Sequence, residues 1–137
     1  MNKKALPTAF SITITVMVCI GLVLGLYAII FLPLKRHPAY QMGMELAKNN
    51  PAVIELFGSP IKDGLFVGGK TQENRYGGSA SLKTSIAGPK ASGSIDIQGI
   101  KDESGAWHIQ SADIRIERKL VLKYSGLRAQ EGFQPAP

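Results

Sequence analysis

The sequence AFSITITVMVCIGLVLGLYAIIFLPL, residues 9–34, places 26 uncharged residues in one run. The hydrocarbon core of a bilayer is about 30 Å thick, and a helix needs about 20 predominantly apolar residues to cross it. The run therefore predicts one transmembrane helix that can span with some tilt. About one hundred residues follow it, which is enough for one domain with a modest core.

Basic residues flank the run on both sides, with Lys3 and Lys4 before it and Lys35 and Arg36 after it. A secretory signal peptide also begins with basic residues, but its apolar core has about 7 to 15 residues and ends at a cleavage site of small residues. The run is longer than that and no such site closes it, while Lys35-Arg36 is typical of a stop-transfer flank. The flanks therefore favour an anchor that is not cleaved.

The orientation of this anchor does not follow from charge alone, because the counts of lysine and arginine at its two ends are nearly equal. The tail before the run is short, residues 1–8, and long domains cross membranes largely regardless of charge. We expect the N-terminus inside and the C-terminal domain outside.

The formal net charge of +6 is concentrated at the flanks of the run. Four of the 16 basic residues lie there, and all ten acidic residues lie in the soluble part, which keeps a balance of only +2. Such a domain lacks the electrostatic footprint of nucleic-acid binding, so no nucleic-acid partner is expected. The lipid bilayer is an expected partner, because the flanking charges can contact anionic headgroups.

Two short helices are expected after a basic linker at residues 35–39. The first carries apolar residues at helical spacing: Tyr40, Met44 and Ala47. Asn50 suits the N-cap of the second helix and Pro51 suits its first position. Its apolar face holds Val53, Ile54 and Phe57. Gly58, with Pro60 just beyond, ends it.

From about residue 65 the apolar residues alternate along the chain, which indicates strands with one face on a core. The residues in phase are Leu65 and Val67, then Leu82, Thr84 and Ile86, then Ile95 and Ile97. Short turns are expected at 74–78, 87–89 and 102–105. Strands joined by short turns form an antiparallel meander, and the helices should pack on one face of it.

The last strand, from residue 107 to 122, shows a change of phase. Trp107 and Ile109 share one parity, whereas Ile114, Ile116, Leu120 and Leu122 have the other. A shift of one residue turns every side chain to the opposite face. We therefore predict a β-bulge within residues 110–112, which would return the later set to the core. Arg115, Glu117 and Lys119 would then line an exposed face.

The sequence thus predicts the α+β class. Its parts are a tail at 1–8, a transmembrane helix at 9–34, a linker at 35–39, a domain at 40–127 and a disordered tail at 128–137. The domain should hold one or two short helices on an antiparallel β-meander. The final tail is expected to be disordered because it carries two prolines and a glycine and little to bury.

Residues 64–71, GLFVGGKT, fit the phosphate-loop pattern of glycine, four residues, then glycine-lysine-threonine. That mechanism needs a strand before the loop and a helix after it, so that backbone amides can hold the phosphates. Here the variable positions of the pattern, Leu65 to Val67, are themselves predicted to form a strand. A turn, not a helix, is predicted after Thr71. We expect the match to be accidental, and nucleotide binding through Lys70 and Thr71 is the least favoured hypothesis.

His37, Met42 and Met44 form a set of soft ligands that would suit copper(I). Met42 and Met44 are two residues apart, however, and point to different sides of a helix. Packing is the favoured interpretation, with a copper-handling protein as the alternative function. Cys19 is the only cysteine and lies in the apolar run, which excludes an intramolecular disulfide and a cysteine-based zinc site.

No catalytic constellation is evident, and no enzyme activity or cofactor is expected. Serine, histidine and aspartate all occur, but without a nucleophile-elbow sequence. His108 follows Trp107 in a strand, so it should face solvent, and no carboxylate partner is apparent for it.

Three segments give the chain a resemblance to a known family. They are NPAVIELFGSPI (50–61), GGSASLKTSIAGPKASG (77–93) and WHI (107–109), and they follow a membrane helix and a short linker. In this order they resemble the cytochrome oxidase complex assembly protein family, whose members are related to a subunit of the mitochondrial inner-membrane protein translocase. The resemblance covers the whole chain except the tail.

The resemblance implies a non-enzymatic, membrane-anchored factor that assists the biogenesis of cytochrome c oxidase through contacts with oxidase subunits or other assembly factors. It also implies a domain on the periplasmic side or its mitochondrial equivalent. The short basic N-terminus lacks an arginine- and serine-rich transit segment, which favours a bacterial inner membrane.

Some residues of the matching segments are candidates for partner contact: Asn50, Pro51, Gly58, Pro60, Gly88, Lys90 and Gly93. Each has a second interpretation. Asn50, Pro51, Gly58 and Pro60 are explained by the ends of a helix, and the glycines by tight turns or bulges. A bare backbone that a partner strand approaches is the alternative. Arg115 and Lys119 are further candidates on the exposed face.

Overall fold

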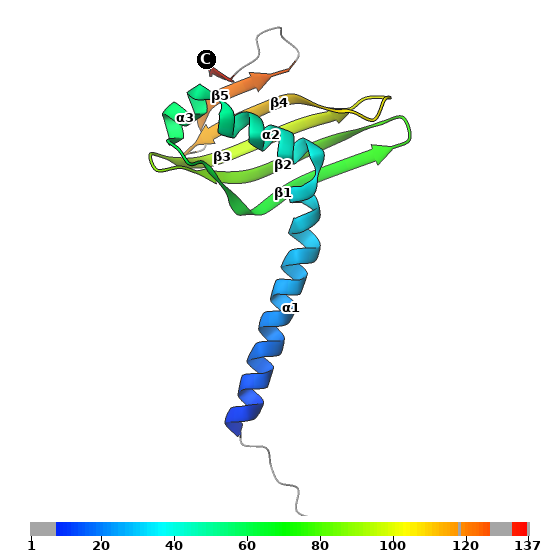
Figure 1. Cartoon of the computed structure of the whole chain (residues 1–137), viewed down its shortest axis with the longest axis vertical. Helices are drawn as coiled ribbons and strands as arrows, with labels where there is room; N and C mark the ends of the chain where they lie inside the picture. The colour runs from blue at the N-terminus through cyan, green and yellow to red at the C-terminus, as the bar shows by residue number, and fades with distance from the viewer. Residues whose placement is uncertain (1–7, 118, 127–132, 137) are drawn as a thin grey trace, which may run out of the picture. The chain divides into compact units, whose positions relative to one another are not determined.

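The structure is a computed structural model that describes residues 8–117, 119–126 and 133–136. Contacts along the chain separate two compact units, Met1–Pro33 and Leu34–Pro137. The first consists of most of one long helix, and the second holds the remaining helices and all the strands (Figure 1).

Helix α1, Thr8–Arg36, confirms the expected N-terminal apolar helix. Residues Phe10–Arg36 are long and apolar enough to cross a membrane. The helix was expected to end at Leu34, but it continues through Pro33 to Arg36. Proline removes one backbone donor, yet its fixed φ is compatible with a helix. The linker expected at 35–39 is therefore reduced to His37.

Helix α2, Pro38–Asn49, and helix α3, Pro51–Phe57, begin in the same way. The N-cap residues are His37 and Asn50, and each accepts a hydrogen bond from the amide two residues later, at 3.3 Å and 3.0 Å. Each N-cap is followed by a proline, whose missing donor costs nothing at the first helical position. The start of α3 at Asn50-Pro51 is as predicted.

The strands form one antiparallel sheet in chain order. They are β1 Lys62–Asn74, β2 Gly77–Ala87, β3 Ser92–Lys101, β4 Trp107–Ile116, β5 Lys119–Ser125 and β6 Phe133–Pro135. Helices α2 and α3 lie on one face of the sheet (Figure 1). The predicted α+β class and the β-meander are confirmed.

The core lies between these two layers. The helices contribute Tyr40, Met44, Ala47, Val53 and Phe57, and the sheet contributes alternate residues including Leu82, Ile86, Ile95, Ile97, Trp107 and Ile114. Glycine lets the layers approach closely, because a Cβ on Gly43 of α2 would lie 2.6 Å from the Ile97 side chain of β3. The apolar phases seen in the sequence therefore identified the buried face, except at Leu65. This residue was expected to face the core with Val67 but is exposed, because the register of β1 shifts between Asp63 and Val67.

The predicted bulge in the fourth strand is confirmed at Gln110. Gln98 pairs with Ser111 and Gly99 pairs with Ile109, so Gln110 is the extra residue of β4. Ile114 is fully buried as a result. The prediction of one strand through Leu122 is wrong, because the chain reverses after Ile116 and Lys119 pairs with Ile116. Glu117 begins this turn at a φ of 48°.

The tail expected to be disordered from residue 128 contains a strand. β6 pairs with β5, placing Leu122 opposite Pro135 and Tyr124 opposite Phe133. Phe133 is buried in the core, and its ring centroid lies 5.8 Å from that of Tyr124. This aromatic residue supplies the apolar area that the composition of the tail seemed to lack. Residues 128–132 and 137 of that tail lie outside the described residues.

Candidate functional site

The candidate residues of the α3 region meet at the two ends of that helix. Asn50 and Pro51 begin it, Gly58 ends it with a φ of 79°, and Pro60 follows through a cis peptide bond. Lys90, in the turn between β2 and β3, donates from its amide to the Phe57 carbonyl at 2.9 Å and from its ammonium to the Glu55 carbonyl at 3.2 Å. A cation at a helix C-terminus also favours the helix dipole. These residues join α3 to the sheet.

Gly88 and Gly93 are sites of close backbone approach. A Cβ on Gly88 would lie 2.1 Å from the Phe57 carbonyl oxygen, and a Cβ on Gly93 would lie 2.3 Å from that of Arg115. Real atoms do not approach so closely, so only glycine fits. Both glycines serve contacts within the domain. The structure brings Gly58, Gly88 and Lys90 together, whereas Gly93 lies in β3 beside β4.

The side of the sheet away from α2 and α3, here called the open face, is polar. Alternate residues place on it Ser81 and Lys83 of β2, Asp96 and Gln98 of β3, and Asp113 and Arg115 of β4. Arg115 is hydrogen-bonded to Asp96, whose Oδ2 also lies 3.7 Å from Lys83 Nζ. Asp96 directly opposes Asp113, and Asp113 opposes Lys123. The cations offset the repulsion between two opposed carboxylates.

Arg115 and Lys119 do not share a face, contrary to the prediction. Directly opposed residues of an antiparallel pair point to the same side. Lys119 opposes Ile116, which has the parity of the buried Ile114, whereas Arg115 lies on the open face. The reversal of the chain after Ile116 is the cause.

A second cluster, here called the anchor cluster, consists of Lys35, Tyr40, Lys48 and Asp63. Asp63 Oδ2 accepts from Tyr40 Oη at 2.8 Å and from Lys35 Nζ at 3.2 Å, and Oδ1 accepts from Lys48 Nζ at 3.2 Å. Lys35 Nζ also donates to the Gly64 carbonyl at 2.7 Å. Burial raises the pKa of Asp63, but these hydrogen bonds outweigh it and lower the pKa to about 2. The cluster fixes the end of α1 to the start of β1.

The anchor cluster is not evident in the sequence, because Lys35 and Asp63 are 28 residues apart. In the sequence, Lys35 is interpreted as the flank of a membrane helix, and Asp63, beside Lys62, is interpreted as a surface residue. The only available signal was a carboxylate at the start of a strand next to an apolar pair, Leu65-Phe66.

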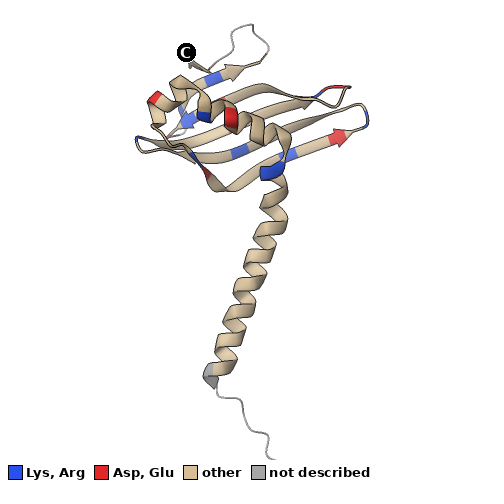
Figure 2. Ribbon diagram, viewed as in Figure 1, with Lys and Arg blue, Asp and Glu red and all other residues tan. Residues whose placement is uncertain are grey.

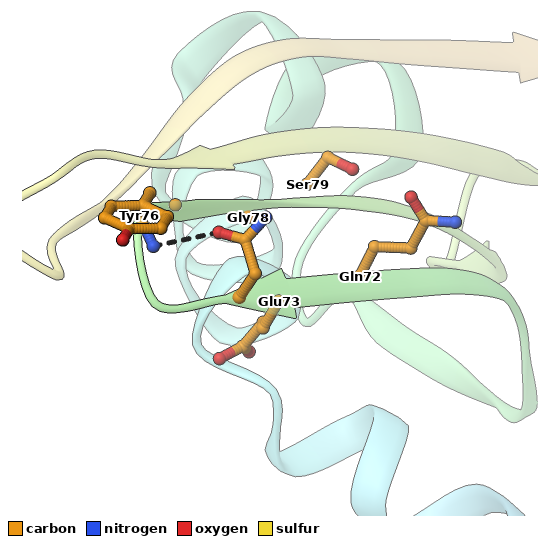
Figure 3. Close-up of a pocket in the computed structure, with 7 residues that line it drawn as sticks. Gln72, Glu73, Tyr76, Gly78 and Ser79 are labelled. Atoms are coloured by element: carbon orange, nitrogen blue, oxygen red, sulfur yellow. Dashed lines mark hydrogen bonds between the residues drawn. The ribbon is translucent and has the colours of Figure 1, made fainter.

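A shallow cavity of about 390 Å³ lies at the hairpin between β1 and β2, lined by Gln72, Glu73, Tyr76 and Ser79 among others. Figure 3 shows Gln72 and Ser79 pointing to one side of the sheet and Glu73 to the other. A hydrogen bond from Lys101 Nζ lowers the pKa of Glu73, which also lies 3.2 Å from His37 Nε2. The side chains that line this cavity therefore point in different directions and do not converge on a ligand.

The phosphate-loop match lies within β1. Residues 67–71 pair in register with residues 80–84 of β2, and the strand continues to Asn74. Their backbone is extended in a ladder, and a turn leads into β2 where a phosphate loop would lead into a helix. The structure therefore contradicts the geometry that nucleotide binding through Lys70 and Thr71 needs.

The three soft ligands are not brought together. Met44 is buried, Met42 is 40% exposed on another side of α2, and His37 Nδ1 caps this helix. The His37 ring also packs edge-on against Trp107, with centroids 4.6 Å apart. Among the residues that the structure describes, no group of three or more His, Cys, Asp and Glu could hold a metal ion.

His108 has a carboxylate partner that was not foreseen. Its Nε2 lies 2.7 Å from Asp102 Oδ2, and Ser104 Oγ donates to Asp102 Oδ1 at 2.5 Å. In a catalytic triad the serine bonds to the histidine and the histidine to the aspartate. Here the aspartate stands in the middle and also accepts from the Ala106 amide. The arrangement is that of a capped turn between β3 and β4.

Comparison with known proteins gives one family. The model of a family described as cytochrome oxidase complex assembly protein 1 matches residues 12–123. The match begins inside α1 and ends in β5, so it includes the apolar helix, the helical layer and most of the sheet. Comparison with curated proteins and with solved structures gives no match to this chain.

Proposed function

Because the chain belongs to the cytochrome oxidase complex assembly protein 1 family, we propose that it is a membrane-anchored, non-enzymatic assembly factor. It takes part in cytochrome oxidase assembly by contacting subunits of the oxidase or other assembly factors. Helix α1 holds it in the membrane, and the domain from Leu34 onward makes the protein contacts.

The observation that carries this proposal is the extent of the family match. Residues 12–123 include the apolar helix as well as the domain, so the two parts match as a unit. An anchor keeps a factor at the membrane, where oxidase subunits are inserted. The charge pattern is consistent with this role, because α1 has no charged side chain before its last turn (Figure 2).

Two observations support contact over catalysis. The residues that resemble a phosphate loop are extended in β1, and the Ser104, Asp102 and His108 side chains are bonded in the order of a turn. The open face of the sheet, in contrast, offers a broad polar surface of charged, amide and hydroxyl side chains. Such a surface suits a protein partner better than a small molecule, which binds in a concave apolar site.

The proposed location is a bacterial inner membrane with the domain on the periplasmic side. The length of the domain after the span supports this orientation, because long domains cross membranes largely regardless of charge.

The test is to delete the gene and then to reintroduce it, either unchanged or as a variant. The deletion should lower the absorbance of the oxidase haems in isolated membranes, and the full chain should restore it. Tagged protein purified from membranes in a mild detergent after crosslinking should carry oxidase subunits or assembly factors. Normal oxidase without the protein, together with no such subunits on the tagged chain, would refute the proposal.

Two variants separate the proposal from the other hypotheses. Lys70→Ala should restore the oxidase fully, because Lys70 is an exposed strand residue. Met42→Leu should do the same, because it keeps the size of an exposed side chain and removes only the thioether. Loss of function in the first would favour nucleotide binding, and loss in the second that copper restores would favour copper handling.

A further inference from the structure

The sheet has two edges of different character, β1 and β6. β6 is short, and Pro135 in it has no amide to offer a further strand. From Val67 to Asn74, in contrast, β1 pairs with β2 in unbroken register, and no proline interrupts it. These residues, 67–74, are here called the β1 edge. Short strands and proline are two means by which proteins protect the edges of sheets, and only β6 uses them.

The outer side of the β1 edge carries a row of backbone donors and acceptors. In an antiparallel pair, residues that exchange hydrogen bonds with the neighbouring strand alternate with residues that direct the amide and carbonyl away from it. Only β2 borders β1 in the sheet. Within the part of the chain that the structure describes, the backbone hydrogen bonds outside the regular elements include none to residues 67–74. The amides and carbonyls that point away from β2 are therefore available to a further strand.

Both sides of the β1 edge are accessible. Lys70 and Gln72 lie on the open face and are exposed. Thr71 opposes the buried Ala80, so it lies on the side of the core, yet it is exposed as well. The reason is that helix α2 packs over β3 and β4, nearer the middle of the sheet. A strand laid beside β1 could therefore direct side chains to either side.

The side chains of the β1 edge favour a specific partner strand over aggregation. A long apolar edge is an aggregation site, whereas residues 68–74, GGKTQEN, contain no large apolar side chain. Packing within the domain does not explain Gly68, because a Cβ there would have nothing within 4 Å. A glycine in a strand often marks a site where another backbone approaches closely. The edge therefore suits a partner that binds mainly through its main chain.

We propose that the β1 edge receives an extended segment of the protein partner as one more strand of the sheet. The segment belongs to an oxidase subunit or to another assembly factor, has no proline where it pairs, and bonds through its amides and carbonyls to those of residues 67–74. In this mode of binding the main chain supplies affinity and alternate side chains supply specificity. The inference rests on the proposed function, which supplies the class of partner.

Photo-crosslinking from adjacent residues tests whether the partner is a strand. A photoreactive phenylalanine analogue replaces Thr71 or Gln72 in the full chain, because successive strand residues point to opposite sides of a sheet. The same analogue at Gln98 of β3 is the control, since Gln98 is exposed on the open face and away from the edge. Membranes are irradiated, the tagged chain is purified, and the crosslinked partner peptides are identified by mass spectrometry.

Positions 71 and 72 should both crosslink to one segment of an oxidase subunit or assembly factor, several-fold more strongly than position 98. An equal or stronger crosslink at position 98 would place the partner on the open face and refute the added strand, while the proposed function would stand. Crosslinks from 71 and 72 to a second copy, or to another part of this chain, would also refute it. No crosslink at any position, with no oxidase subunits or assembly factors on the tagged chain, would overturn both.

Proline substitutions test the contribution of the main chain. Of two adjacent strand residues, one directs its amide to the neighbouring strand and the other directs it outward. One of Thr71→Pro and Gln72→Pro should therefore lower the stability of the domain in urea unfolding, and the other should leave the ladder with β2 intact. The proline variant that stays stable should carry several-fold less of the partner, because an outward donor is lost.

Lys70→Ala is the matched control for the proline variants. It shortens an exposed side chain of the same edge and keeps every amide, so it should carry as much partner as the unchanged chain. Full recovery of the partner on the stable proline variant would refute recognition through the main chain. If both proline variants unfold, the crosslinks at positions 71 and 72 decide the question.

Discussion

Gly88 and Lys90 join the end of α3 to the sheet by different means. Gly88 leaves space for the Phe57 carbonyl, and the Lys90 amide then donates to that carbonyl at 2.9 Å. The last carbonyls of a helix lack partners within it. The turn between β2 and β3 thus satisfies a carbonyl of α3 while holding the helix against the sheet.

Gly88→Ala should destabilise the domain by about 1 to 3 kcal/mol, as overpacking usually does. The added methyl group meets backbone, which cannot rotate away as a side chain can. Gly68→Ala is the matched control, because nothing lies within 4 Å of a Cβ there, and its effect should stay within about 0.5 kcal/mol. Urea unfolding in detergent, followed by the fluorescence of the single Trp107, measures both. Equal effects would contradict the close approach at Gly88.

Asp63 makes the stability of the domain dependent on pH. Burial raises its pKa, but the hydrogen bonds from Tyr40, Lys35 and Lys48 lower it to about 2, from an ordinary value of 3.8. The folded state therefore binds a proton less readily than the unfolded state. The contribution to stability is present above about pH 4 and is lost as the pH falls toward 2, and it amounts to about 2 kcal/mol.

Asp63→Asn should remove this contribution and flatten the fall in stability between about pH 4 and pH 2. The free energy of unfolding of both proteins, measured by urea titration across that range, tests it. Glu55→Gln is the control, because none of the described side-chain hydrogen bonds and ion pairs involves that carboxylate. An unchanged slope in Asp63→Asn would show that the anchor cluster does not stabilise the domain.

At the scale of elements, the alternation of apolar and polar residues predicted the strands and the bulge in β4. It did not predict the hairpin between β4 and β5. Ile114 and Trp107 can share the core only if one residue is extra, and Gln110 is that residue. The reversal after Ile116 has no glycine or asparagine to mark it, although Glu117 has a φ of 48°. A charged residue at such a φ gives no turn signal in sequence. Because this hairpin was not predicted, Lys119 was assigned to the wrong face of the sheet.

The candidate site was predicted less well than the fold. Contacts made by residues near in sequence, such as Asn50 capping α3, follow from local chemistry. Lys35 with Asp63, and Gly88 with Phe57, depend on how distant segments are brought together. Sequence spacing does not encode such pairs, so the anchor cluster and the tie between α3 and the sheet appear only in three dimensions.

Deletion of residues 127–137 tests the role of β6. Phe133 is buried, and β6 pairs with β5 and contacts α3. Its loss should cost about 3 kcal/mol or more, comparable with truncation of a core phenylalanine. Phe133→Ala in the full chain should reproduce most of the loss in urea unfolding. Unchanged stability after the deletion would mean that β5 is a sufficient edge for the sheet.

For the whole molecule, the proposed function depends on which side of the membrane the domain occupies. The flanks of α1 carry nearly equal basic charge, Lys3 and Lys4 against Lys35 and Arg36. The basic residues at the two flanks therefore do not decide the orientation.

Reporter fusions decide the orientation, and the fusion point must follow Pro137 so that β6 is retained. Alkaline phosphatase folds actively only in the periplasm, so the fusion should be active, while a fluorescent protein that matures only in the cytoplasm should be dark at the same point. A phosphatase fusion lacking residues 1–34 is the control and should be inactive, because it has no segment to direct export. An inactive full-length phosphatase fusion with a bright fluorescent one would place the domain in the cytoplasm.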